Sequence, residues 1–476
     1  MRYLLLQRKD LYTNPILHLV SFLRMRSKIL PLVLGAALLT AIGAGFWRAG
    51  FFQQSAAIRK GDQTTAFTAS RTGVALVPQK GDAPIDDEIR SLQNKARSKH
   101  QPPELMKRLG WAFVRKARLS YDPGYYKLAE QCALVVESQR ADDPDALLLQ
   151  GHILQSLHKF KEAESIARKL VSVRRDPADQ GLLGDVLMEQ GNLTEAVGAY
   201  QHMVNLRPDL QSYTRVANLR WLKGDLDGAI EVIQMAATAA SPRDPEPGAW
   251  AYTRLGIYSL QAGQLDVAET SASFALQYAH DYPPALLLRG RVLLAQGKPT
   301  VALPFLRQAA ALNPLPEYQW ILADALSLTG EPGAAQAVEQ KLMATGATND
   351  PRTFALFLAS RRERLTDSLQ LAFDELKTRQ DVFTMDALAW ALRANGRLTE
   401  GLDYSRKSLA GGTQDARLFY HAGCISMECG NQTDAAEFFG KANGIKQMLF
   451  PSERSDLNKQ FAALKKIETT GPIAQQ

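Results

Sequence analysis

Recognised catalytic motifs are missing from the 476-residue sequence. It contains no G-x-x-x-x-G-K-(S/T) phosphate loop, no H-E-x-x-H metal-binding helix and no G-x-S-x-G nucleophile turn. Its seven histidines are scattered, and the two closest, His152 and His158, are six residues apart, a spacing that does not place both rings on one helix face. We therefore expect no catalytic residue, no metal site and no cofactor, and we classify the chain as a non-enzyme.

Cysteine is almost absent, since the chain has only Cys132, Cys424 and Cys429. No C-x-x-C pair exists that could hold zinc or carry out disulfide exchange. Cys424 and Cys429 fall within one expected helix, where a separation of five residues corresponds to about 8 Å along the axis at ~1.5 Å per residue. That distance exceeds the reach of an unstrained disulfide. We expect all three to be small packing residues.

An excess of either charge is absent from most of the chain. The formal net charge is +7, but residues 1–60 hold nine basic residues and one acidic residue. The other 416 residues contain 47 basic and 48 acidic residues, a net charge of −1. The basic isoelectric point is therefore a property of the N-terminal segment, and we expect the rest of the chain not to bind nucleic acid.

Long apolar runs are also scarce, and only residues 29–47, ILPLVLGAALLTAIGAGFW, extend for nineteen residues without a charge. This length is about that of a membrane-spanning helix. Six basic residues precede the run, which favours a cytoplasmic basic segment at 1–28 and an extracytoplasmic position for everything after residue 47. The sequence thus predicts a single-pass membrane protein with a periplasmic or cell-surface domain.

Two alternatives for this N-terminal region stay open. The run is either an uncleaved signal anchor, favoured by its length, or a signal peptide whose cleavage would release the chain as a secreted protein. Translation from Met25 would give a more usual lead to the run than translation from Met1. Residues 48–102, rich in Gly, Pro, Ser and Thr and without a sustained period, are expected to form a flexible linker.

What the sequence does contain is a repeat of about 33 residues. A small residue is followed seven positions later by Gly and five positions after that by Ala, as at Gly184, Gly191 and Ala196. One degenerate copy, near residues 349–381, has Leu356 and Glu363 in place of the small residue and the Gly. The same frame recurs at Ala217, Gly224, Ala229; Gly256, Gly263, Ala268; Gly290, Gly297, Ala302; Ala323, Gly330, Ala335; and Gly423, Gly430, Ala435.

This spacing predicts two antiparallel helices per unit. The small residue lets the neighbouring helix approach, the mid-unit Gly ends the first helix, and the Ala lies at the tight contact of the second. Each unit buries its apolar face against the next, so the units stack into an array. Residues 451–468 are amphipathic and suit a C-terminal capping helix, and 469–476 are expected to be a disordered tail.

The repeats at residues 103–450 resemble the tetratricopeptide repeat family. The unit that starts at Pro177 carries the family pattern at Leu183, Gly184, Ala196, Tyr200 and Pro208. The resemblance implies an all-α fold, a right-handed α-solenoid of about ten helix-turn-helix repeats, here preceded by one transmembrane helix. It also implies a concave groove, lined by the first helix of each unit, that binds protein segments.

Transferring the family's groove positions gives a set of candidate partner-binding residues. Four tryptophans are among them, and such rings are frequent in binding hot spots. The alternative that these rings pack between neighbouring units stays open. The candidates that we select are Trp221, Trp250, Trp320, Trp390, Asp185, Asp324, Arg291 and Arg393.

The same transfer predicts an acidic groove, with eight acidic and four basic side chains. Such a groove suits an extended segment with basic and apolar side chains. The acidic positions are Asp145, Asp185, Glu189, Glu317, Asp324, Asp350, Asp386 and Glu428; the basic ones are Arg291, Arg361, Arg393 and Arg417.

These expectations together describe a membrane-anchored scaffold or adaptor, an assembly factor for a multiprotein complex. The alternative is a factor in the export or assembly of an envelope polysaccharide, with inward-facing aromatic rings stacked on the sugars. The expected partners are protein or peptide segments, and the membrane through residues 29–47; a glycan is the partner under the alternative.

Overall fold

The computed structural model describes residues 71–98 and 102–470, which belong to one compact unit, Ser70–Gln476. This part of the chain contains the α-helices α2 to α23, helical residues at 71–75, one 3-10 helix and no strand. The basic segment at 1–28, the apolar run at 29–47 and the tail from 471 lie outside the described residues. Within them, no helix combines the length and the hydropathy needed to cross a bilayer.

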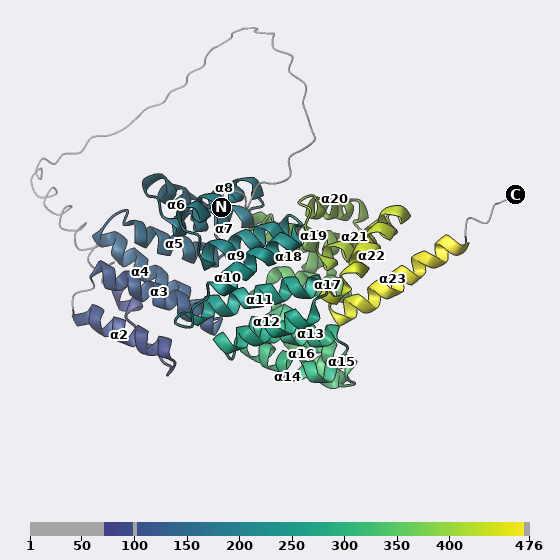
Figure 1. Ribbon diagram of the computed structural model, residues 1–476, viewed down its shortest axis with the longest axis horizontal. Helices are drawn as coiled ribbons and strands as arrows, with labels where there is room; N and C mark the ends of the chain where they lie inside the picture. Colours follow the sequence, from purple (N-terminus) through teal and green to yellow (C-terminus); the bar gives the residue numbers. More distant parts are fainter. Residues whose placement is uncertain (1–70, 99–101, 471–476) are drawn as a thin grey trace, which may run out of the picture. The chain divides into compact units, whose positions relative to one another are not determined.

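Ten antiparallel helix pairs follow one another along the array (Figure 1). In each pair the odd-numbered helix comes first, and the bounds of the first five pairs are α3 (Pro103–Ser120) and α4 (Gly124–Gln139); α5 (Pro144–Ser156) and α6 (Phe160–Val173); α7 (Pro177–Glu189) and α8 (Leu193–Leu206); α9 (Leu210–Leu222) and α10 (Leu226–Thr238); α11 (Pro245–Gln261) and α12 (Leu265–Tyr278). The other five pairs are α13 (Pro283–Ala295) and α14 (Pro299–Leu312); α15 (Pro316–Leu328) and α16 (Pro332–Asn349); α17 (Pro351–Arg361) and α18 (Leu365–Thr378); α19 (Val382–Ala394) and α20 (Leu398–Leu409); α21 (Ala416–Glu428) and α22 (Gln432–Gly444).

The helix pairs form because the repeats supply residues that cap the start of a helix and small residues where helices must pack closely. Asp143, for example, caps α5 by accepting hydrogen bonds from the backbone N–H groups of Asp145 and Ala146. At Gly184, Gly290 and Gly423 the small residue of the repeat lies where the two helices of a pair meet. At Gly184 a Cβ atom would lie 2.3 Å from Cε1 of Tyr200, so no larger residue fits there. The degenerate copy at 349–381 still folds as the pair α17 and α18.

The predicted linker at 48–102 is wrong for its C-terminal part, because α2 (Pro84–Ser98) lies within it. The side chains of Ile85, Ile89 and Leu92 are spaced to form one apolar face, and they are buried in one hydrophobic cluster with Met106 and Phe113 of α3. With α2 included, the array contains more helices than the ten predicted pairs and their cap. At the other end, η1 (Lys446–Met448) and α23 (Pro451–Thr470) follow α22.

The array winds far enough for its middle and its C-terminal part to touch. Figure 1 shows the teal helices α7 to α11 beside the green helices α17 to α21. The backbone N–H of Gln380 donates to the carbonyl of Glu189 over 3.1 Å, and Oγ1 of Thr413 donates to the carbonyl of Leu222 over 2.6 Å. Nε2 of Gln447 donates to the carbonyl of Gln261 over 2.8 Å. We call this line of contacts between residues 189–261 and 379–448 the seam.

Candidate functional site

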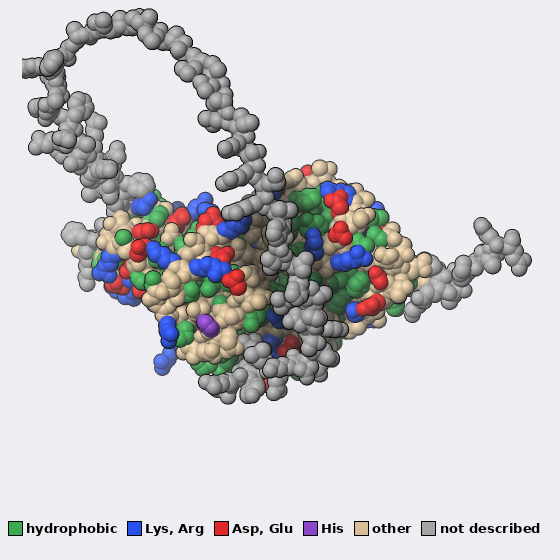
Figure 2. Space-filling view, turned by 90° about the horizontal axis from the view of Figure 1, so that it is seen from above, with side chains coloured by type: hydrophobic (Ala, Val, Ile, Leu, Met, Phe, Trp, Pro, Cys, Tyr) green, Lys and Arg blue, Asp and Glu red, His purple; other side chains and the backbone are tan. Residues whose placement is uncertain are grey.

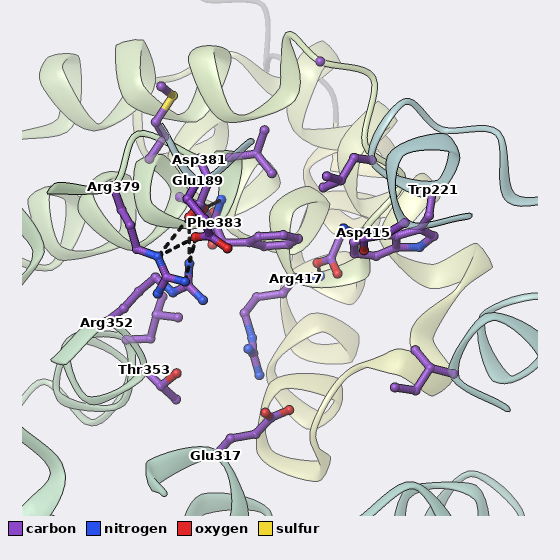
Figure 3. A pocket seen from close by; sticks show the side chains of 18 of the residues that line it. Glu189, Trp221, Glu317, Arg352, Thr353, Arg379, Asp381, Phe383, Asp415 and Arg417 are labelled. Carbon is purple, nitrogen blue, oxygen red and sulfur yellow. Dashed lines mark hydrogen bonds and ion pairs between the residues drawn. The ribbon is translucent and has the colours of Figure 1, made fainter. Parts of the chain in front are cut away.

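A cavity of about 720 Å³ lies between the first helices of the pairs and the seam. Eight first helices, from α7 to α21, each contribute lining side chains, so the inner surface is built as the family resemblance implies. Figure 3 shows charged side chains converging on this space: Arg352 and Arg379 point toward Asp381, and Arg417 extends between Asp415 and Glu317. The site is therefore a partly open cavity, bounded by the first helices and the seam.

One wall of the cavity is an ion-pair network at the seam. Arg379, in the connector before α19, pairs with Glu189 at the end of α7 over 2.7 Å, and Arg352 of α17 pairs with Asp381 over 3.1 Å. Asp381 also caps α19 through the backbone N–H groups of Phe383 and Thr384. Burial raises the pKa of Glu189, and the arginine opposes that effect. These side chains hold one another, so they stiffen the wall.

A second charged group surrounds Arg417 of α21. Its Nε donates to Oε1 of Glu453 in α23 over 2.5 Å, and its guanidinium lies 4.7 Å from the ring centroid of Phe450. Asp415, the N-cap of α21, accepts from the backbone N–H of Arg417, and burial raises the pKa of this aspartate. The pair Arg417–Glu453 thus joins the last helix to the cavity wall.

The four predicted tryptophans lie in different environments, and only Trp221 lines the cavity. Its ring lies nearly parallel to those of Tyr258 and Phe383, with centroids 6.0 and 5.9 Å away, and its Nε1 donates to Oε1 of Gln261 over 2.7 Å. Trp250 is half-buried and lies outside the cavity. Trp221 is 8% exposed, so little of its ring is open to a ligand.

Trp320 and Trp390 are core residues rather than groove residues. They are 1% and 3% exposed. Trp320 meets the rings of Phe357 and Phe450 edge-on, and Trp390 stacks on His421 at 3.8 Å. For these two rings, packing between neighbouring units is the observed outcome, because a shift of one position on a helix turns a side chain from the inner surface into the interface.

Of the four predicted charged residues, only Arg291 lines the cavity. Asp185 instead pairs with Arg215 over 2.7 Å, and Arg393 pairs with Glu428. Asp324 is buried, and its Oδ2 accepts from the backbone N–H of Ser452 over 2.8 Å. These three residues join neighbouring pairs or the C-terminal helix and do not line the cavity.

The predicted acidic groove is wrong for the cavity, which carries six basic and five acidic side chains. The prediction counted acids that turn out to join neighbouring pairs, and it missed arginines that reach the cavity from the seam and from other first-helix positions. The basic residues are Arg254, Arg291, Arg352, Arg379, Lys407 and Arg417; the acidic ones are Glu189, Glu317, Asp381, Asp386 and Asp415.

A comparison with known protein families gives one match, to the tetratricopeptide repeat, at residues 182–245, 253–315 and 287–349. These segments cover the helices from α7 to α16. The chain contains tetratricopeptide repeats. Its tetratricopeptide array is an all-helical scaffold suited to protein binding. A search of curated proteins gave no match.

Several solved structures are similar in part. A thermophilic TPR protein of Thermus thermophilus is 20% identical, with a TM-score of 0.35, over 40% of this chain and 100% of that chain. Human IFIT1 with PPP-AAAA is 12% identical, with a TM-score of 0.45, over 79% of this chain and 99% of that chain. A tetratricopeptide repeat protein from Parabacteroides merdae is 18% identical, with a TM-score of 0.30, over 53% and 98%.

The tetratricopeptide pattern did not reveal the seam, although the sequence carries a signal for it. Every first helix from α3 to α17 has a proline at its start or just before it, whereas the connectors 379–381 and 411–415 before α19 and α21 have none. Proline lacks the backbone N–H that Gln380 uses to reach Glu189. The missing prolines thus mark the two connectors that form the seam.

Proposed function

We propose that the tetratricopeptide array binds a short protein segment inside this cavity and thereby serves as a scaffold for assembling a multiprotein complex. The observation that carries this proposal is the cavity itself, about 720 Å³ and lined from eight successive first helices. This volume lies in the range of pockets that enclose a small ligand, ~300–1,000 Å³. It suits a segment of a few residues rather than a long peptide.

The lining supports a peptide as the occupant because it combines polar and apolar side chains. Asn218 and Thr353 offer neutral polar groups, and Leu287, Leu356 and Met385 offer apolar surface. A peptide presents the complementary mixture, with a backbone N–H and C=O at each residue. Contacts from several repeats, each of modest strength, then add up to specific binding.

A cavity-filling substitution tests the proposal. An array of amidated hexapeptides is screened with the full-length chain in detergent, and the affinity of the binders is measured by fluorescence anisotropy. Met385 lines the cavity. Met385→Trp should weaken binding at least tenfold, because the indole occupies space that the segment needs. The matched control is Val301→Trp, since Val301 is 54% exposed and does not line the cavity. Equal affinity of both variants for every binder would contradict the proposal.

A glycan is the second candidate ligand. The sequence suggested it because inward-facing aromatic rings could stack on sugars. In the cavity the ring of Trp221 is 8% exposed and already has the rings of Tyr258 and Phe383 as neighbours. A polysaccharide array screened beside the peptides separates the two candidates: binding of glycans alone, lost in Met385→Trp, would favour the polysaccharide export role. No observation in the described residues supports a catalytic function, and we propose none.

We also propose that the array does not bind nucleic acid. The cavity holds nearly equal numbers of basic and acidic side chains, and most of its arginines are already paired with carboxylates. On the face drawn in Figure 2, basic and acidic side chains are interspersed rather than gathered by sign. A phosphate backbone needs an uncompensated basic surface.

Residues 29–47 are proposed to anchor the chain in a membrane, with the array on the extracytoplasmic side. The support is the nineteen-residue run without a charge and the six basic residues before it. The full chain should stay in the membrane pellet after an alkaline carbonate wash, and a variant lacking residues 29–47 should be released. Protease added outside intact cells of the expression host should digest the array; its protection would contradict the orientation.

A further inference from the structure

We propose that the cavity selects a segment with acidic side chains, and that Arg254 and Arg291 are the residues that bind them. This inference rests on the proposed function, because it names the chemistry of the segment that the same cavity takes. It reverses the basic segment expected from the sequence.

Arg254 of α11 has no carboxylate partner in this part of the chain. Its Nη2 donates to two neutral acceptors, Oδ1 of Asn218 over 2.9 Å and the hydroxyl of Tyr258 over 3.0 Å. Its Nε is buried without a hydrogen bond, and its guanidinium lies 5.7 Å from the ring centroid of Trp221. The neighbouring groups orient this cation and leave its charge uncompensated.

Arg291 of α13 is compensated only weakly. Its Nη2 donates to the carbonyl of Met448 over 2.8 Å, and its nearest carboxylate, Glu317, is 3.8 Å from Nη1. Its side chain is 14% exposed. Burial lowers the pKa of Arg291, since the guanidinium has lost water without gaining a close anion.

The other arginines of the cavity differ, because each forms a close pair with a carboxylate. Arg352 pairs with Asp381, Arg379 with Glu189, and Arg417 with Glu453, over 2.5 to 3.1 Å. The acidic side chains of those pairs are therefore not available to the two remaining arginines.

The other carboxylates of the cavity are held by neighbouring groups as well. Oδ2 of Asp386 lies 2.8 Å from Nδ1 of His421, and Asp415 accepts from two backbone N–H groups at the start of α21. Glu317 is 40% exposed, and it is the distant partner of Arg291. Three cavity cations therefore lack a close carboxylate partner within the described residues: Arg254 and Arg291, on the first helices α11 and α13 of two consecutive pairs, and the exposed Lys407 of α20.

An acidic side chain would supply what both arginines lack. A guanidinium presents a planar set of N–H donors that matches the two oxygens of a carboxylate. A charge-assisted pair of this kind, formed away from water, is stronger than a neutral hydrogen bond. A basic segment would instead bring like charges together, and a neutral one would leave the guanidinium groups uncompensated.

The test scores the hexapeptide array by peptide charge, with every peptide amidated so that no terminal carboxylate contributes. For the full-length chain, peptides with two Asp or Glu residues should bind about tenfold more tightly than their Asn or Gln counterparts. Arg254→Gln should abolish most of this preference, because it should weaken binding of the acidic peptides far more than binding of their amide counterparts. Arg291→Gln should act in the same way. That variant also loses the hydrogen bond to Met448, which could destabilise the seam. Arg254→Gln removes only hydrogen bonds to neutral groups, so it still tests the inference in that case.

Arg307→Gln is the matched control, because Arg307 is exposed and pairs with Glu331 away from the cavity. It should retain the full preference for acidic peptides. The thermal unfolding midpoint of each variant is measured to confirm that it is folded.

Three results would overturn the inference: a preference for basic peptides, no dependence on charge, or an acidic preference that persists in both cavity variants. If peptides bind regardless of charge and Met385→Trp abolishes binding, the proposed function stands and only the acidic selection fails. If no peptide binds, both fail. Binding of a labelled single-stranded RNA that Arg254→Gln abolishes would reassign the arginines to phosphate and likewise overturn the inference.

Discussion

Replacing Gly224 with alanine should open the seam. Gly224, in the turn between α9 and α10, has a φ of +80° and lies against the connector before α21. A Cβ atom added to Gly224 would be 2.4 Å from the carbonyl oxygen of Gly412. No Cβ tolerates that distance, so one of the two backbones must move, and the neighbouring bond from Thr413 to Leu222 should break with it. The free energy of unfolding should fall by about 2–5 kcal/mol, from the left-handed backbone (~1–2) and the steric overlap (~1–3).

Gly297→Ala separates these two contributions. Gly297 occupies the same place in its repeat, with a φ of +74°, and a Cβ added to it meets nothing within 4 Å. This control should lose only ~1–2 kcal/mol and keep the seam closed. Chemical denaturation measures the stability, and small-angle scattering with limited proteolysis of residues 411–415 measures the opening. If the two variants were equally stable and equally compact, the contact between Gly224 and Gly412 would contribute nothing.

Replacing Asp324 with asparagine should stabilise the protein above pH 6. Burial raises the pKa of Asp324 to about 6 in the folded chain, whereas an unfolded chain titrates an aspartate near ~3.9. Between these values the folded state binds more protons, so the free energy of unfolding falls as the pH rises from about 4 to 6 and stays lower above it. Asparagine carries no charge, and the gain at pH 8 should be about 1–3 kcal/mol, at ~1.4 kcal/mol per pKa unit.

The asparagine side chain can preserve the contact at this position, because its amide oxygen can accept from the N–H of Ser452, as Asp324 does. Arg361, the other partner of Asp324, keeps its ion pair with Glu339. Denaturation curves from pH 4 to 8 measure the effect: the difference between the variant and the parent should grow between pH 4 and 6 and then level off. Asp324→Ala is the contrasting variant and should destabilise the protein, since it leaves the buried N–H of Ser452 without its acceptor. A constant difference across the range would show that Asp324 does not titrate there.

The helix pairs were predictable from the sequence because their signals are local. The spacing of Gly184, Gly191 and Ala196 fixes where two helices approach and where the first one ends. Even the degenerate copy with Leu356 folds as a pair, since its neighbours supply the apolar surfaces on both sides. The helix α2 was missed because its apolar period is short and begins within a stretch of linker-like composition.

The cavity was only partly predictable, because it depends on how far the array winds. Small rotations between successive pairs add up from α7 to α21 and bring Gln380 next to Glu189. The residue spacing within one repeat does not reveal this total rotation. The side-chain assignments failed for a related reason. Trp320 and Trp390 point in nearly the same direction as cavity-lining residues of their own helices. Whether such a side chain faces the cavity or the interface with the next pair depends on how that pair packs, which the sequence of one helix does not determine.

The seam also changes how the protein must fold. In an ordinary solenoid each repeat contacts only its neighbours, so folding spreads along the chain and contact order is low. Here Arg379 must find Glu189 across 190 residues, and Thr413 must find the carbonyl of Leu222 across 191. Because closing so long a loop costs entropy that only assembled helices can offset, ring closure should be the last and slowest step. Until α19 to α21 have been synthesised, the seam cannot form, and the cavity-lining surface of the nascent chain should be exposed to solvent.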